Sequence, residues 1–144
     1  ACKLNILTVP SYIFQYATML SDIDLSAFTS FGNYSFAYCR MLKEVTLSEN
    51  LTSIGSNSFV YCITLSKIHC QATTPPTLGT AVFNYLPTDF IIYVPVGYGD
   101  TYKQAEGWST YADHILEEGQ TPNRAMLSRL AKAVDTDDDV GDMR

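Results

Sequence analysis

A unit of 22 to 24 residues recurs four times along this chain. Each copy is anchored by a phenylalanine, and the anchors are Phe14, Phe36, Phe59 and Phe83. Two places after each anchor comes a tyrosine, and these are Tyr16, Tyr38, Tyr61 and Tyr85. Each copy then ends in a run such as Leu42, Val45 and Leu47, where apolar and polar residues alternate. Period two is the pattern of a half-buried strand, so each unit predicts one short strand.

No single unit is large enough to bury its own phenylalanine, so the units must stack on one another. Stacking at the strand spacing of ~4.8 Å would align phenylalanine on phenylalanine and strand on strand. We therefore predict an α/β solenoid: a right-handed coil with a short parallel sheet on one wall and single turns or single-turn helices on the other. A β-sandwich with chance amphipathic strands is the alternative, and four matched Phe-x-Tyr triplets argue against it.

The alternation also predicts which strand residues face outward. They are Asp22, Asp24, Glu44, Thr46, Lys67, His69, Ile91 and Tyr93. This face would form a rigid binding platform that changes from acidic at one end to apolar and aromatic at the other. Ile91 and Tyr93 are the predicted anchors, because exposed aromatic residues carry much of the binding energy at interfaces. In the alternative, these residues only solubilise the sheet and Tyr93 covers the end of the repeats.

The four cysteines form neither a zinc motif nor a disulfide framework. Cys39 and Cys62 occupy equivalent positions in adjacent units, so they should stack about 5 Å apart. Their Cβ vectors should run parallel, which favours two reduced thiols over a disulfide. Cys70 lies where the other units carry leucine, and it is expected in the core.

The unit IGSNSFVYCITLSKI resembles the BspA-type bacterial leucine-rich repeat. The resemblance covers roughly residues 9–115, and its last part resembles the C-terminal cap of such proteins. Ala17 stands in place of the usual cysteine in the first unit, and Asp89 in place of leucine in the fourth. The resemblance implies a leucine-rich-repeat fold and a cell-surface or secreted protein that adheres to macromolecules.

The chain divides into three parts by pattern. Residues 1–95 are predicted to be the repeats, 96–115 the C-terminal cap, and 116–144 a linker, an amphipathic helix and an acidic tail. Trp108 is expected to pack inside the cap. The helix, predicted over 123–134 with Pro122 at its start, has a narrow apolar stripe and should either dock back or meet another chain. We favour a partner or a symmetric copy, with contact through 122–144.

Several functions are disfavoured by composition and motifs. The net charge of −6 and the lack of a basic cluster argue against nucleic acid. No run of about 18 apolar residues predicts a membrane span, and no signal peptide is visible at Ala1. No catalytic motif, cofactor motif or metal-ligand spacing occurs, so we expect neither an enzyme, a cofactor nor a metal. The acids of 135–139 lack the glycine and glutamate spacing of a calcium loop.

Two functions remain compatible with the sequence. The first is a non-enzymatic protein-interaction module of a bacterial surface or secreted protein. The second is a structural subunit of a larger particle, such as a bacteriophage fibre or decoration protein, which would belong to a virion. The sequence identifies neither the ligand nor whether further repeats precede Ala1.

Overall fold

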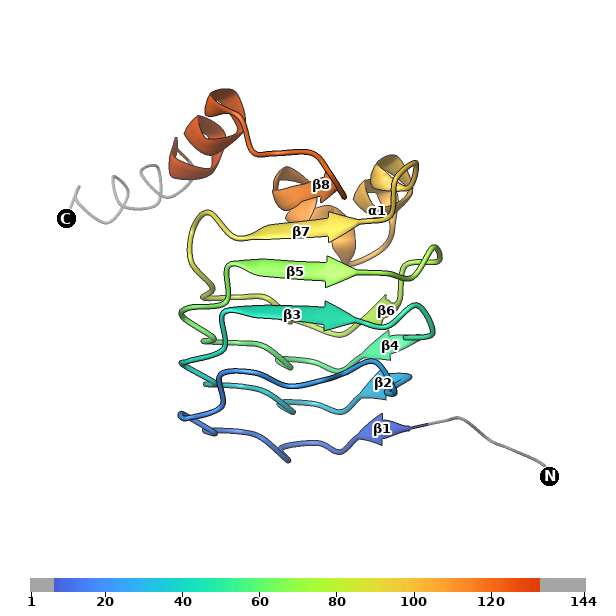
Figure 1. Ribbon diagram of the computed structural model, residues 1–144, viewed down its shortest axis with the longest axis vertical. Helices are drawn as coiled ribbons and strands as arrows, with labels where there is room; N and C mark the ends of the chain where they lie inside the picture. The colour runs from blue at the N-terminus through green and yellow to red at the C-terminus, as the bar shows by residue number, and fades with distance from the viewer. Residues whose placement is uncertain (1–6, 133–144) are drawn as a thin grey trace.

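The computed structural model describes residues 7–132. In chain order its elements are β1 (Thr8–Val9), β2 (Ser30–Phe31), β3 (Glu44–Leu47), β4 (Ser53–Ile54), β5 (Lys67–Cys70), β6 (Thr77–Leu78), β7 (Ile91–Val94), α1 (Gly99–Gln104), the 3-10 helix η1 (Trp108–His114) and β8 (Ile115–Glu117) (Figure 1). A further helix runs over 124–132. The repeats lie one above another, and α1 and η1 sit on the last of them.

The longer strands form a parallel sheet in the order β3-β5-β7-β8, which we call the outer sheet. Its register aligns Val45 with Ile68 and Ile68 with Ile92, so that these apolar side chains stack one above another in the core. Burial alternates along β3, as period two requires. The parallel sheet predicted for the second, third and fourth repeats is therefore confirmed.

The first repeat differs from the prediction, because residues 20–25 form no strand and β3 is the edge of the outer sheet. Leu25 is still buried, whereas Asp22 and Asp24 are exposed. Asp22 comes 22 residues before Glu44, so strand pairing in the register of the repeats would set two carboxylates opposite each other. Like charges directly opposite destabilise a strand pair, which accounts for the lost strand.

A second parallel sheet, in the order β1-β2-β4-β6, was not predicted. Each of its strands has only two residues, too few for periodicity to reveal. Val9, Phe31 and Ile54 are in register and fill the core. The residues before them face outward, and the hydroxyls of Thr8 and Ser30 lie 2.8 Å apart.

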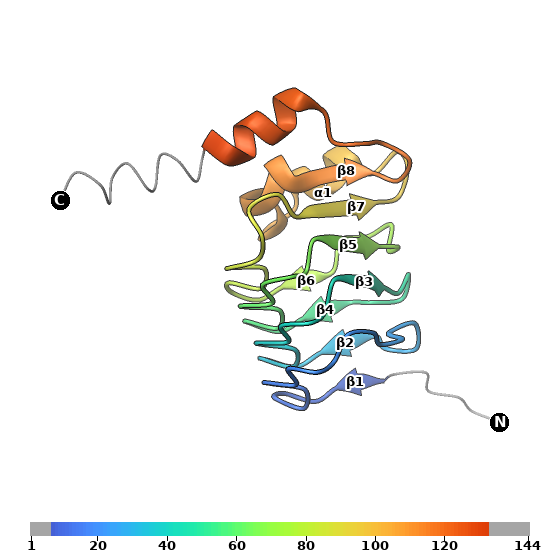
Figure 2. The ribbon, with the colours of Figure 1, turned by 60° about the vertical axis from the view of Figure 1, so that its left-hand side comes forward.

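The anchor phenylalanines lie in stacked turns, on what we call the turn wall: residues 11–19, 33–41, 56–64 and 80–88 (Figure 2). Backbone hydrogen bonds join the turns. The N–H of Phe14 donates to the carbonyl of Ser35 at 2.9 Å, and the N–H of Phe36 donates to that of Ser58 at 2.8 Å. The single turns predicted for these segments are therefore present.

The turn wall uses left-handed backbone at two positions of every repeat. The φ angles lie between 57° and 65° at Tyr12, Tyr16, Tyr34, Tyr38, Asn57, Tyr61, Ala81 and Tyr85. Such angles are unfavourable for residues other than glycine, so they persist because the neighbouring repeats fix them. The four Phe-x-Tyr tyrosines all occupy one of these positions.

The anchor phenylalanines form a continuous column, as predicted. Ring centroids are 5.2 Å apart from Phe14 to Phe36, 5.3 Å from Phe36 to Phe59 and 5.9 Å from Phe59 to Phe83. Successive rings lie within 15° of parallel. Each repeat's interior is therefore completed by its neighbours.

Cys39, Cys62 and Cys70 are free, buried thiols, which confirms the prediction of reduced cysteines. The thiol of Cys39 donates to the carbonyl of Phe14, 3.3 Å away. The thiol of Cys62 makes the same contact one repeat later, with Phe36 at 3.1 Å. These weak hydrogen bonds join adjacent repeats inside the core.

The cap covers the end of the phenylalanine column. Trp108 is fully buried, 5.9 Å from the Phe83 ring and 4.9 Å from the Tyr102 ring. Its indole N–H donates to the carbonyl of Pro76 at 2.7 Å. Gly107, with φ of 83°, breaks the chain between α1 and η1. The predicted packing role of Trp108 is confirmed.

Two expectations for the C-terminal part are corrected. Residues 116–121 were predicted to be linker, but β8 extends into them and pairs with β7. The helix is capped by Asn123, whose Oδ1 accepts a 2.8 Å bond from the N–H of Met126, so Pro122 lies before the cap. The described part of this helix docks back on the repeats instead of requiring a partner. The predictions for residues 133–144, including the acidic tail, lie outside the described residues.

Candidate binding surface

The exposed face of the outer sheet carries the residues predicted to bind, and its centre is a cluster of fixed side chains. Nε2 of His69 lies 2.6 Å from a carboxylate oxygen of Glu44. Nδ1 of the same ring lies 2.8 Å from a carboxylate oxygen of Glu118. A doubly protonated imidazolium donates to both carboxylates, whereas a neutral ring can donate to only one.

The His69 ring also stacks on Tyr93, with centroids 5.1 Å apart and planes 13° apart. Lys67 and Thr46 are exposed beside it. The face thus presents the His69 and Tyr93 rings and two carboxylates held by contacts between segments that are far apart in the chain, with the exposed Lys67 beside them. Side chains fixed in this way lose less entropy when a partner binds.

Glu118 is a member of this cluster that sequence reasoning missed. It follows β8, outside the repeats, so the period-two pattern could not assign it to a face. Its backbone N–H donates to the carbonyl of Val94 at 2.9 Å, which fixes the chain beside β7. No motif in the sequence signals this placement.

The acidic end of the face is hollowed because residues 20–25 do not pair with β3. A hollow of about 390 Å³ is lined by Asp22, Ile23, Asp24, Leu25, Ser26, Glu44, Thr46 and Gln71. The N–H of Ser26 donates to Asp24 at 2.9 Å and lowers the pKa of that carboxyl. This end therefore keeps its negative charge and suits basic side chains.

The other end corrects the prediction of two exposed anchors. Ile91 points outward from the sheet, but Met126 and Leu130 of the C-terminal helix cover it and leave it buried. Tyr93 remains half-buried at the margin of this cluster. The structure therefore removes Ile91 as an accessible contact.

A hollow of about 500 Å³ remains between the helix and the sheet. It is lined by Ser66, Lys67, Asp89, Ile91, Tyr93, Thr121, Pro122 and Leu127. Leu127 is 41% exposed there, so the hollow combines apolar surface with the charges of Lys67 and Asp89. A partner side chain could enter between Tyr93 and Leu127.

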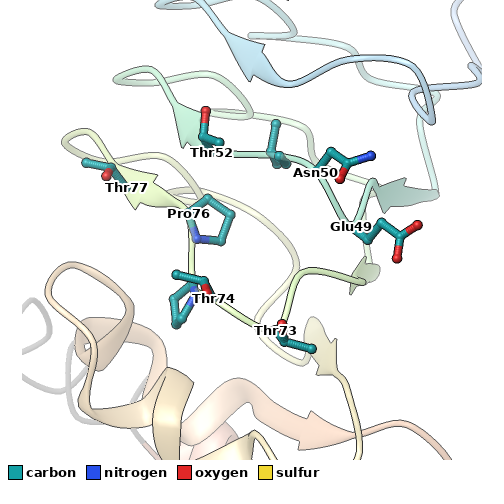
Figure 3. A pocket seen from close by; sticks show the side chains of 9 residues that line it. Glu49, Asn50, Thr52, Thr73, Thr74, Pro76 and Thr77 are labelled. Carbon is teal, nitrogen blue, oxygen red and sulfur yellow. The ribbon is translucent and has the colours of Figure 1, made fainter. Parts of the chain in front are cut away.

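A third hollow, of about 400 Å³, was not predicted (Figure 3). It is lined by Glu49, Asn50, Leu51, Thr52, Thr73, Thr74, Pro75, Pro76 and Thr77. It lies beside residues 71–76, which make the third repeat longer than the others. The step from Phe59 to Phe83 is 24 residues, whereas the earlier steps are 22 and 23. Its lining is hydroxyl and prolyl surface with a single charge, that of Glu49.

The remaining reactive groups of residues 7–132 are structural. The hydrogen bond with Cys39 and burial raise the pKa of the Cys62 thiol, and burial raises that of Cys70. Burial lowers the pKa of His114, which stacks on Phe90 at 3.8 Å. Within 7–132, no group of three metal-binding side chains occurs and no helix is long and apolar enough to cross a membrane.

Comparison with protein families gives one match. A model described as the BspA type leucine-rich repeat region matches residues 2–88 in six copies. The match starts before residue 9, where the visible pattern begins, and it ends before the cap. No curated protein matches the chain.

Proposed function

Because the chain belongs to the BspA-type leucine-rich-repeat family, we propose that it is a non-enzymatic module that binds another protein through the outer sheet. Repeats of this kind stack as a right-handed solenoid, and we take the two parallel sheets to be two of its walls. Such families generally serve binding, so the function is sought on a surface and not in a catalytic cleft.

One observation carries the proposal: three different segments of the chain converge on the outer face at His69. Glu44 comes from β3, Glu118 from the segment after β8, and Tyr93 from β7. The partner we propose has basic groups for the acidic hollow and an apolar side chain for the hollow at Tyr93. The proposed binding face is thus the graded platform predicted from the sequence, without Ile91, which is buried.

We further propose that the chain acts at a cell surface or as a secreted protein, which is the expectation that the family suggests. In the alternative, a subunit of a larger particle, residues 122–144 would make the assembly contact. Met126 and Leu130 instead pack on Ile91 of the same chain. That contact withdraws support from the alternative.

The test compares variants of the full chain in a cell-binding assay. Immobilised protein is presented with bacterial and host cells, and the bound surface protein is isolated for affinity measurement. The double variant Lys67→Glu with Tyr93→Ala should fold normally and weaken binding at least about tenfold. Thr73→Ala, an exposed change in the hollow of Figure 3, serves as the matched control and should bind like the wild type.

The opposite pattern would place the function elsewhere. If the double variant binds with unchanged affinity, the outer sheet is not the binding face. If Thr73→Ala weakens binding instead, the threonine and proline hollow becomes the candidate.

A further inference from the structure

The C-terminal helix (124–132) has no polar attachment to the rest of the described chain apart from any made by its last residue, Lys132. Hydrogen bonds hold the chain up to Gln120, whose N–H donates to the carbonyl of Glu117 at 3.0 Å. Among the described residues, 121–131 form no hydrogen bond and no ion pair with 7–118. A single stretch of chain after β8 joins the helix to the molecule (Figures 1 and 2). Residues 121–131 can therefore move away from the sheet without breaking a polar contact.

Two apolar side chains hold the helix in place. Met126 and Leu130 lie one turn apart and pack on Ile91, and each of the three is only 4% exposed. The other residues of 124–132 are exposed. The nine residues of helix that the structure describes are fewer than the roughly 12–15 that an isolated helix needs in water. The order of the helix therefore depends on its docking.

The helix covers the apolar end of the outer sheet. The strand register sets Ile91 beside Lys67, Tyr93 beside His69, and Leu116 beside Tyr93. Removal of the helix would extend the exposed face from the His69 cluster over three large apolar side chains, which are Ile91, Tyr93 and Leu116. With the helix docked, the 500 Å³ hollow at its margin is what remains open of this surface.

We infer that the C-terminal helix is a movable cover for the apolar end of the binding face. It opens while the repeats and the cap stay folded, and apolar side chains of a partner then take the place of Met126 and Leu130 on Ile91. The opening is a property of this chain alone. The exchange of Met126 and Leu130 for a partner's side chains rests on the proposed function.

The two halves of this inference are linked by one quantity, the open fraction. A partner that needs the open state binds with an affinity reduced by the fraction of molecules that are open. Two buried side chains only slightly outweigh the entropy lost in ordering a helix, so we expect about 1–10% of molecules to be open. The helix should then show amide protection factors of about 10–100.

Hydrogen exchange of the full chain, read by mass spectrometry of peptides, measures the opening. Peptides that contain β5 and β7 should be protected at least about 1000-fold more than 124–132, because those strands exchange only when the repeats separate. Equal protection of the helix and these strands would mean that the helix opens only when the whole molecule unfolds. That result overturns the inference.

Alanine variants test whether the two apolar contacts hold the cover. Met126→Ala with Leu130→Ala removes the contacts and keeps a strong helix former at both positions, so lost protection cannot reflect helix propensity. Protection of 124–132 should fall below about threefold, with the urea midpoint followed by Trp108 unchanged. Ser128→Ala with Arg129→Ala, at exposed positions of the same helix, is the control and should stay within about threefold of the wild type. Wild-type protection in the first variant overturns the inference.

Binding to the partner isolated by the cell-binding assay tests the second half. Met126→Ala with Leu130→Ala should bind about 10- to 100-fold more tightly, by the same factor as the protection measured in the wild-type helix. Unchanged or weaker binding would show that the helix does not compete with the partner. The proposed function fails on a different result, unchanged binding by Lys67→Glu with Tyr93→Ala, and exchange still decides whether the helix moves.

Discussion

Replacing Phe59 with alanine tests whether the phenylalanine column holds the repeats together. The Phe59 ring is fully buried and lies between Phe36 and Phe83, with planes 4° and 15° from parallel. The Phe31 ring meets it edge-on at 6.0 Å. Both ring faces and one edge therefore contact other aromatic rings.

The loss of stability follows from these contacts. Full burial of a phenylalanine is worth roughly 1.5–3 kcal/mol, and the cavity left by truncation raises the cost of Phe→Ala to about 3–5 kcal/mol. The aromatic contacts of Phe59 place it in the upper part of that range, at about 4–5 kcal/mol. Phe14 is half-buried at the end of the column and stacks only on Phe36, so Phe14→Ala should cost about 1–2 kcal/mol.

Urea unfolding measures both losses. Circular dichroism follows the repeats, and fluorescence of Trp108, the single tryptophan, follows the cap. Phe59→Leu keeps much of the buried volume, so its free energy of unfolding should lie between those of the wild type and Phe59→Ala. It provides a folded variant for comparison if Phe59→Ala does not fold. Both probes should move together, because the cap packs on the same column.

Equal losses of stability for Phe59→Ala and Phe14→Ala would refute this reasoning. They would mean that each phenylalanine is buried by its own repeat and that neighbours add nothing. A loss below about 2 kcal/mol for Phe59→Ala would do the same, since it would show that the cavity closes without the column.

Two other changes test the C-terminal part. Asn123→Ala removes the helix cap and should cost about 1 kcal/mol, which corresponds to amide hydrogen exchange about fivefold faster in 124–132. The control Ser128→Ala should leave the exchange rates of this helix unchanged. Equal exchange rates in the two variants would contradict the capping role of Asn123. His114→Asn tests pH dependence. Burial lowers the folded-state pKa of His114, so the unfolded chain binds its proton first; the stability is present above about pH 6.5 and is lost as the pH falls towards the folded pKa. Thermal midpoints between pH 7.5 and 5.5 should fall further for the wild type than for the variant, and parallel falls would exclude this role.

The periodic parts of the fold could be predicted because each repeat obeys the same rules. The spacing of the phenylalanines predicts the column, and alternation predicts the inward residues of β3, β5 and β7. The strand of the first repeat could not be obtained in this way. Its apolar pattern is intact, and opposed carboxylates prevent the pairing that the pattern alone predicts.

The candidate site was predictable only where it depends on the repeats. Period two assigned His69 and Glu44 to the outer face, but it could not show that the two side chains meet. Glu118 and the cover over Ile91 come from segments after the repeats, and such contacts depend on how the chain returns to the sheet. A pattern within one strand holds no information about which later segment covers it.

The rung of cysteines gives the molecule a reporter of its own opening. Cys39 and Cys62 are fully buried, and each thiol hydrogen points at the backbone of the preceding repeat. An alkylating reagent can reach either sulfur only after two repeats have separated. The rate at which Cys39 and Cys62 themselves are labelled in native conditions, read by peptide mapping, therefore measures how often the stack parts at that rung, without any probe being added to the chain.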